Sequence, residues 1–199
     1  MLKVAGLKIC LMTANFWKQR GVPIIAYHSI DDSNSYLSIS PQMFFLQMSH
    51  LKEEGWNTIT IHQLLQYKYE NRLPEKSVVL TFDDGLQNFY KAAWPILFQF
   101  GFTATVFIPT NYIGEKAWWY SDYDLEPLPI LTWDQMKELD AHGIDIQSHG
   151  CSHNEPNCFD IDDMRYEAQQ SKAILEQGLS KSIKIFCFPF GQTPPSMIE

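Results

Sequence analysis

The chain has 199 residues, of which 45% are hydrophobic and 19% charged, with a formal net charge of −8. This composition excludes a disordered chain, and the length suits one domain with a sizeable core. The negative charge, without a compensating cluster of Lys and Arg, argues against a nucleic-acid-binding surface. The four cysteines, Cys10, Cys151, Cys158 and Cys187, lack C-x-x-C spacing, so we expect free thiols rather than a zinc ribbon or redox motif.

The N-terminal segment, residues 1–20, is expected to be an extension ahead of one domain at residues 21–199. Its longest apolar run covers only residues 9–12, which is a poor match to a signal peptide. No stretch of about 18 apolar residues occurs, so no membrane span is expected. On these grounds the sequence favours a cytoplasmic location.

From residue 22 onward, short apolar runs alternate with longer amphipathic ones. Strands are predicted at residues 22–30, 56–61, 77–82, 102–108, 144–148 and 182–191. Helices are predicted from Ser40-Pro41 to Gly55, at 61–69, at 88–100 with a kink or a new start near Pro95, at 132–142 with Thr132 as N-cap, and from Asp160 or Asp162 to Gly178. This alternation indicates β/α units and a mostly parallel sheet, either open or closed into a barrel.

Polar residues that share a chemistry follow several of these strands. His149 and His153 come after one strand, and their spacing allows two imidazoles to converge on one metal ion. Functional residues gather at the carboxyl ends of parallel strands, so a carboxylate from another strand end would complete a His₂Asp site. Three protein ligands with an open fourth position are typical of a catalytic zinc-type site.

Asp83 and Asp84 supply such carboxylates at the end of the strand 77–82. Adjacent side chains of an extended segment point to opposite sides, so one carboxylate can bind the metal while the other takes a proton from water. The alternative is that Asp-Asp-Gly is only a turn after a strand. The histidine pair favours the metal site.

The motifs "TFDDG", "SHGCSH" and "FCFPFG", in this order, resemble the polysaccharide deacetylases of carbohydrate esterase family four, which share the NodB homology domain. The segments "PIIAYHSI", "LTWDQMKEL" and "AHGIDIQSH" further resemble the biofilm poly-N-acetylglucosamine deacetylases. The resemblance covers roughly residues 22–191. It implies a distorted (β/α) barrel and one divalent metal ion, expected to be Zn²⁺.

The resemblance also implies roles for individual residues. Asp83 matches the catalytic base, and Asp84, His149 and His153 match the metal ligands. Phe190 lies in the motif whose backbone N–H helps to hold the oxyanion. The implied reaction is hydrolysis of an N-acetyl group of an acetylated glycan, with release of acetate.

Two positions depart from the family pattern. Cys187 stands where many members carry an Arg that pairs with the base, although the biofilm-related branch commonly lacks that Arg. The family's late His, its general acid, has no counterpart after His153, so we expect a domain and a barrel that are incomplete at the C-terminus. His28 is a possible substitute, with a buried structural histidine as the alternative.

The longest loop, residues 110–129, carries Trp118, Trp119 and Tyr120. These rings either line a sugar groove by stacking or cap the hydrophobic core. For the whole chain, the alternatives to an N-deacetylase are a related hydrolase of O-acetyl esters and a weakly active or inactive homologue that retains metal or glycan binding.

Overall fold

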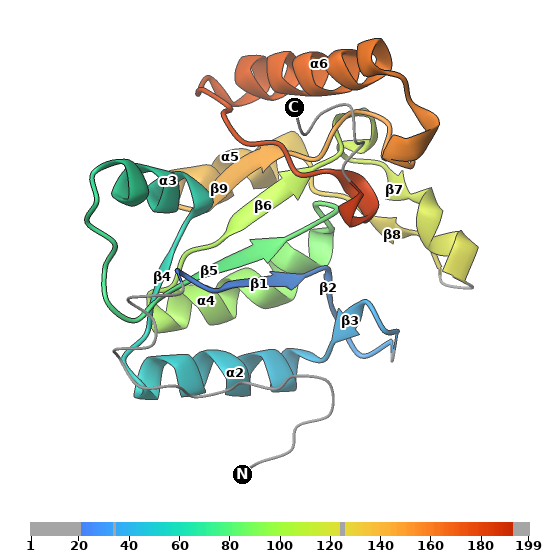
Figure 1. Cartoon of the computed structure of the whole chain (residues 1–199). Coiled ribbons are helices and arrows are strands. Elements are labelled where there is room, and N and C mark those ends of the chain that lie inside the picture. Colours follow the sequence, from blue (N-terminus) through green and yellow to red (C-terminus); the bar gives the residue numbers. More distant parts are fainter. Residues whose placement is uncertain (1–20, 34, 124–125, 193–199) are drawn as a thin grey trace.

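The computed structural model describes residues 21–33, 35–123 and 126–192. The predicted extension at residues 1–20 lies outside the described residues. The five strands of the main sheet are β1 (Ile24–Tyr27), β4 (Asn57–Ile59), β5 (Ser77–Phe82), β6 (Thr105–Ile108) and β9 (Asp145–Ser148). The α-helices are α2 (Pro41–Glu53), α3 (Ile61–Tyr69), α4 (Trp94–Phe100), α5 (Trp133–Ala141) and α6 (Ile161–Leu179) (Figure 1).

Strand β5 is the centre of the sheet, and every residue in it is buried. Its residue Val79 pairs with Ile24 of β1 and with Ile59 of β4, so these two strands lie on opposite edges of β5. Strand β6 follows β4 along the same edge and then pairs with β9. All of these pairings are parallel, which confirms the α/β class. In the described residues β1 and β9 do not pair with each other, so the closed barrel stays a prediction.

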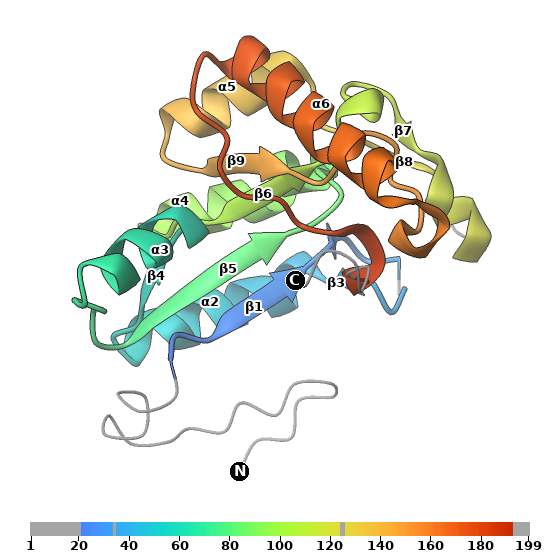
Figure 2. The ribbon, with the colours of Figure 1, turned by 45° about the horizontal axis from the view of Figure 1, so that its top comes forward.

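The helices begin where the sequence places capping residues. Ser40 caps α2 by accepting a hydrogen bond from the backbone of Met43. Thr132 forms a capping box with Gln135 at the start of α5, and Asp160 caps α6. Near Pro95 the chain passes from a π-helical turn into α4, as predicted from the proline. Helices α2, α4 and α5 lie along one face of the sheet, and α6 packs against β9 and α5 (Figure 2).

The last two predicted elements differ from the structure. Gly178 does not end its helix, because α6 continues to Leu179 and Ser180 takes the left-handed conformation. A Cβ at residue 178 would lie only 2.0 Å from the ring of Trp133, so this glycine serves close packing. The segment 182–191 is not a regular strand: it makes a single bridge between Phe186 and Ser148 before a 3₁₀ turn.

The predicted irregular loop contains two short strands, β7 (Lys116–Ala117) and β8 (Leu128–Pro129), which pair antiparallel. Another small pair, β2 (Ser29–Ile30) and β3 (Ser38–Ile39), follows β1. Both pairs extend beyond the carboxyl edge of the main sheet (Figure 1).

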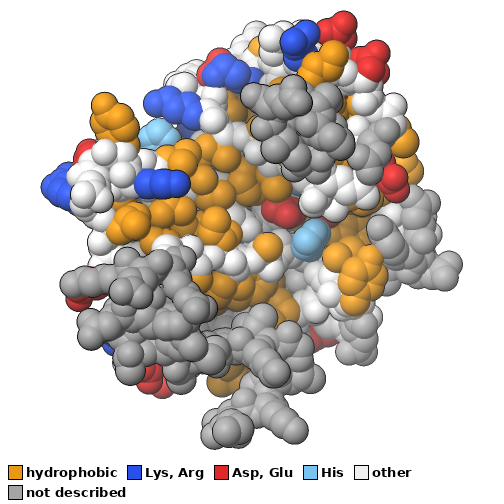
Figure 3. Space-filling view, in the orientation of Figure 1, with side chains coloured by type: hydrophobic (Ala, Val, Ile, Leu, Met, Phe, Trp, Pro, Cys, Tyr) orange, Lys and Arg blue, Asp and Glu red, His pale blue; other side chains and the backbone are white. Residues whose placement is uncertain are grey.

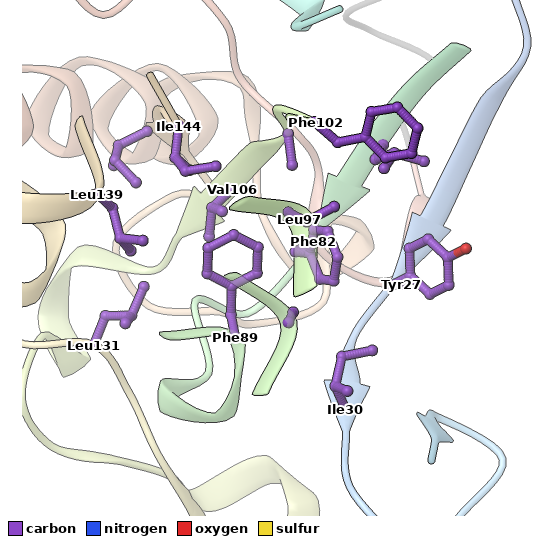
Figure 4. Packing of buried hydrophobic residues seen from close by; sticks show 14 of the residues in the cluster. Tyr27, Ile30, Phe82, Phe89, Leu97, Phe102, Val106, Leu131, Leu139 and Ile144 are labelled. Carbon is purple, nitrogen blue, oxygen red and sulfur yellow. The ribbon is translucent and has the colours of Figure 1, made fainter. Parts of the chain in front are cut away.

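The main hydrophobic core joins the sheet to α2, α4, α5 and α6. The ring of Phe82 stacks on Tyr27 at 5.2 Å and meets Phe89 edge-on at 4.6 Å (Figure 4). Phe44 of α2 packs edge-on against Tyr27. Because Phe82 is the last residue of β5, this packing fixes the position from which Asp83 and Asp84 leave the sheet.

Candidate metal centre

Asp84, His149 and His153 converge beyond the carboxyl edge of the sheet. One potential ligand atom from each lies within 4.8 Å of the other two. Asp84 Oδ1 is 2.9 Å from His153 Nε2 and 3.5 Å from His149 Nε2. All three side chains are buried, and two imidazoles with one carboxylate form a donor set that suits a divalent transition metal. The cluster is therefore consistent with a divalent metal site.

The backbone of this cluster adopts conformations that L-residues rarely take. Asp84 has φ 66° and His153 has φ 52°, both in the left-handed region. Gly85, which follows Asp84, also has positive φ, and a Cβ there would lie 2.7 Å from Ile108 Cδ1. Such conformations persist only where surrounding contacts enforce them, and they often occur at functional sites.

The ring of His149 is oriented by a backbone carbonyl. Its Nδ1 lies 2.9 Å from the oxygen of Cys187, so Nδ1–H donates there and Nε2 faces Asp84. This tautomer is the one needed for metal binding through Nε2. Nδ1 of His153 is buried and has no hydrogen-bond partner in the described residues. Apart from the contact of its Nε2 with Asp84, the position of His153 therefore depends on its backbone and on ring packing.

That packing comes from the aromatic segment after β7. Trp119 stacks on His153, with ring centroids 3.9 Å apart, and its Nε1–H donates to Asp84 Oδ2 at 3.4 Å. The hydroxyl of Tyr120 donates to the same oxygen at 3.0 Å. Both residues are buried in a second small core cluster, while Trp118 is 45% exposed. Sequence reasoning placed these rings on a sugar groove or on the core, and missed that two of them hold Asp84.

The charges of the cluster are coupled. Burial opposes ionisation of Asp84, but hydrogen bonds from His149 and His153 hold the pKa of its carboxyl well below the usual range. Burial disfavours the charged form of His149, yet the hydrogen bond to Asp84 raises its pKa to about 10. Burial lowers the pKa of His153. A cation at this site would take the place of the His149 proton, because only a neutral imidazole binds a metal.

Asp83 lies between the end of β5 and Asp84. Its backbone N–H donates to the carbonyl of Tyr27 at 3.0 Å, and its Oδ1 is buried without a hydrogen-bond partner in the described residues. Its Oδ2 is 4.0 Å from His28 Nε2. Burial raises the pKa of this carboxyl, partly opposed by the charges of His149 and His28. A raised pKa makes Asp83 a stronger base than an ordinary aspartate.

The cluster forms the floor of a cavity of about 540 Å³. Its lining comprises His28, Tyr36, Leu37, Asp83, Asp84, Trp119, His149, His153, Glu155, Phe190, Gly191 and Gln192. Figure 3 shows a histidine and acidic side chains reaching the surface together between hydrophobic ones. Trp118 is not among the lining residues.

Two aromatic rings are both exposed and part of the cavity lining. Tyr36, from the turn between β2 and β3, is 74% exposed, and Phe190 is 40% exposed. Phe190 has φ 58° and its ring lies 5.0 Å from that of His153. The oxyanion role of its backbone N–H stays a prediction. Tyr36 and Glu155 were missed because neither directly follows a predicted strand of the main sheet.

The comparisons with known proteins agree with this geometry. A family model described as polysaccharide deacetylase matches residues 70–199. The chain belongs to the polysaccharide deacetylase family.

No helix in the described part of the chain is long and apolar enough to cross a membrane.

Two bacterial relatives are similar to this chain in sequence. The putative polysaccharide deacetylase YxkH of Bacillus subtilis is 32% identical over 176 residues, which are 88% of this chain and 58% of that protein. The poly-beta-1,6-N-acetyl-D-glucosamine N-deacetylase of Escherichia coli K12 is 28% identical over 147 residues, 70% of this chain and 22% of that protein. The chain thus spans just over half the length of the first relative and less than a quarter of the second.

Solved structures share the fold. The Streptococcus pyogenes deacetylase PplD, in complex with acetate, superposes with a TM-score of 0.76 at 27% identity, covering 89% of this chain and 77% of that one. IcaB from Ammonifex degensii has the same TM-score at 24% identity, covering 88% and 77%, and supports the fold alone.

Proposed function

We propose that this polysaccharide deacetylase is a metal-dependent hydrolase that removes N-acetyl groups from an acetylated glycan. The observation that carries the proposal is the buried Asp84, His149 and His153 cluster, with Asp83 beside it at the floor of an open cavity. Family membership supports the reaction class. We further propose that the parallel sheet is the wall of the distorted barrel implied by the family resemblance.

Asp84 Oδ1 and the Nε2 atoms of both histidines would hold the metal, which we expect to be Zn²⁺. The donor set fits, because His149 Nδ1–H donates to Cys187 so that Nε2 faces Asp84, and Asp84 is held as a carboxylate. A bound cation would supply Lewis acidity to a carbonyl oxygen and lower the pKa of water.

Asp83 acts as the general base in this proposal. Its carboxylate lines the cavity next to the cluster and has an oxygen without a hydrogen-bond partner in the described residues. It would accept a proton from the attacking water and return it to the leaving amine. His28, whose Nε2 is 4.0 Å from Asp83, would orient this carboxylate, and the backbone N–H of Phe190 would stabilise the developing oxyanion.

For the substrate, we propose that a sugar ring stacks on the exposed rings at the cavity rim. Tyr36 and Phe190 line the cavity and have accessible faces. Trp119 and Tyr120 have almost no exposed surface, so among the residues expected from the sequence only Trp118 remains available for stacking. Aromatic faces are common binding surfaces for the apolar faces of sugars.

The decisive experiment is acetate release by the metal-loaded protein with Asp83→Asn as the variant. We expect activity on N-acetylglucosamine oligomers to fall about 100- to 10,000-fold, the usual contribution of a general base, with metal content unchanged. Asp134→Asn, an exposed aspartate of α5, is the matched control and should keep full activity. Full activity of Asp83→Asn would refute the assigned role.

The same assay separates the amide from the ester reaction. Acetate release from acetylated xylan, with none from N-acetylated oligomers, would replace the N-deacetylase by an O-acetyl esterase. Metal binding without release from either substrate would indicate a binding homologue.

A further inference from the structure

Glu167 is a buried carboxylate that the proposed reaction does not use. It lies on α6, away from the cavity lining, and is 7% exposed. In the described part of the chain no Lys, Arg or His lies within ion-pair distance of it. Burying a carboxylate is costly unless hydrogen bonds replace its water. The partners of Glu167 therefore indicate why the fold retains it.

Those partners belong to the loop between the two histidines of the cluster. Glu167 Oε2 accepts hydrogen bonds from the backbone N–H of Cys151 at 2.6 Å and of Ser152 at 3.0 Å. Successive backbone N–H groups that face one oxygen form an anion-binding concavity. A Cβ at Gly150 would lie 2.9 Å from the same oxygen, so the loop fits closely around the carboxylate.

The first half of this loop has other anchors. His149 N–H donates to the carbonyl of Ile108 at 2.9 Å, and the carbonyl of Gly150 accepts from Thr110 N–H at 3.0 Å. These bonds attach the loop to the end of β6. The backbone N–H groups nearest to His153 on its N-terminal side, those of Cys151 and Ser152, are held by Glu167. The carbonyl of Cys151 also accepts a hydrogen bond from Asn111 N–H at 3.1 Å.

His153 directly follows the two N–H groups that Glu167 holds, so its backbone depends on those contacts. It has φ 52°, and its ring makes one polar contact, Nε2 to Asp84 Oδ1 at 2.9 Å, because Nδ1 has no hydrogen-bond partner in the described residues. The direction in which Nε2 points therefore depends on the backbone of the loop. The left-handed conformation persists only while the neighbouring backbone is constrained. Glu167 supplies that constraint from a helix, which is a rigid support.

We propose that Glu167 is a positioning residue of the metal centre: its carboxylate fixes the loop 149–153 so that His153 Nε2 faces Asp84. The inference rests on the proposed metal site, and it assigns to a buried acid of α6 the role of ordering a ligand that it does not touch. Loss of a group that orients a metal ligand typically lowers the affinity for the ion or the activity of the site.

The test compares Glu167→Ala and Glu167→Gln with the wild type in two measurements. Zn²⁺ dissociation constants are measured by competition with a chelator, and hydrogen exchange of the Cys151 and Ser152 amides is measured in the metal-free protein. Glu167→Ala should weaken Zn²⁺ binding about 10- to 100-fold and expose both amides to exchange. Glu167→Gln, whose amide oxygen still accepts, should recover part of both properties.

Leu175→Ala is the matched control, because it removes a fully buried side chain from the same helix and leaves the loop contacts intact. It should lower Tm without changing the dissociation constant or the exchange of the two amides. The proposal is overturned if Glu167→Ala binds Zn²⁺ as the wild type does. It is also overturned if Glu167→Ala and Leu175→Ala lose the same amount of Tm and weaken Zn²⁺ binding equally. Zn²⁺ binding that depends on Glu167, in a protein that releases no acetate, would refute the deacetylase function alone.

Discussion

The hydrophobic core and the candidate metal centre of Asp84, His149 and His153, called the metal centre below, meet at the end of β5, and they position their residues by different means. In the core, Phe44, Tyr27 and Phe82 pack ring against ring from elements with ordinary backbone geometry. In the metal centre, Asp84 and His153 have left-handed backbone and are held by individual hydrogen bonds and one stacked indole. Stability of the fold and affinity for an ion should therefore respond to different substitutions.

The largest expected effect concerns the core. Phe44→Ala removes a side chain that is 0% exposed and should lower the free energy of unfolding by about 3 to 5 kcal/mol. Denaturant unfolding of the metal-free protein measures this change. Phe98→Ala, at 68% exposure on α4, is the control and should cost about 0.5 kcal/mol or less. If Phe44→Ala also abolishes Zn²⁺ binding by the folded protein, the two regions are not independent.

The corresponding change in the metal centre is Asp84→Asn. Zn²⁺ at about 1,000 times its Kd should stabilise the wild type by about 4 kcal/mol, and this increment should nearly vanish in the variant. Removing the metal with a chelator should therefore lower Tm in the wild type but not in Asp84→Asn. Asp83→Asn, the neighbouring aspartate, should keep the metal-dependent increment. An equal loss in both variants would contradict their different roles.

A smaller effect tests whether the core tolerates an added methyl group. Gly178→Ala would gain about 1 kcal/mol from helix propensity alone, but the new Cβ would lie 2.0 Å from the ring of Trp133. We expect overpacking to dominate, with a net loss of about 1 to 3 kcal/mol and unchanged Zn²⁺ affinity. Thermal unfolding decides the sign, with the exposed Gln170→Ala as control. A stabilised variant would show that the helix shifts away from Trp133 at little cost.

The smallest expected effect lies at the cavity rim. Tyr36→Ala should raise KM for a glycan substrate about 5- to 10-fold, equivalent to about 1 kcal/mol of aromatic contact, with kcat and metal affinity unchanged. Trp118→Ala should leave KM unchanged, because this ring is not part of the cavity lining. If only Trp118→Ala raised KM, the sugar would contact the loop 110–129, as the sequence suggested, and not Tyr36.

Much of the fold could be predicted from local patterns. The strand 77–82 and the cap at Thr132 agree with the structure, because apolar runs and capping residues act within a few positions along the chain. Of the two predicted starts of α6, Asp160 and Asp162, the structure has Asp160 as the cap. The end of α6 could not be predicted, because the glycine that suggests a stop accommodates Trp133. Local signals cannot report a contact between helices that are far apart in sequence.

The candidate site divides in the same way. Asp84, His149 and His153 were expected to meet because they follow parallel strands, and the structure brings them together. The contacts of Tyr120 and Glu167 could not be predicted, since each depends on where a loop or helix from another part of the chain is placed. Sequence motifs identified the three residues that cluster, but not the residues that contact them.

The hydrogen bond from His149 to the carbonyl of Cys187 joins residues that are synthesised at different times, because Cys187 lies 38 positions later in the chain. A nascent chain that has left the ribosome as far as His153 already carries the three side chains of the cluster. It still lacks both α6, with Glu167, and the carbonyl that selects the His149 tautomer. The hydrogen bonds around the cluster are complete only when residues 161–187 have been synthesised and have packed against it.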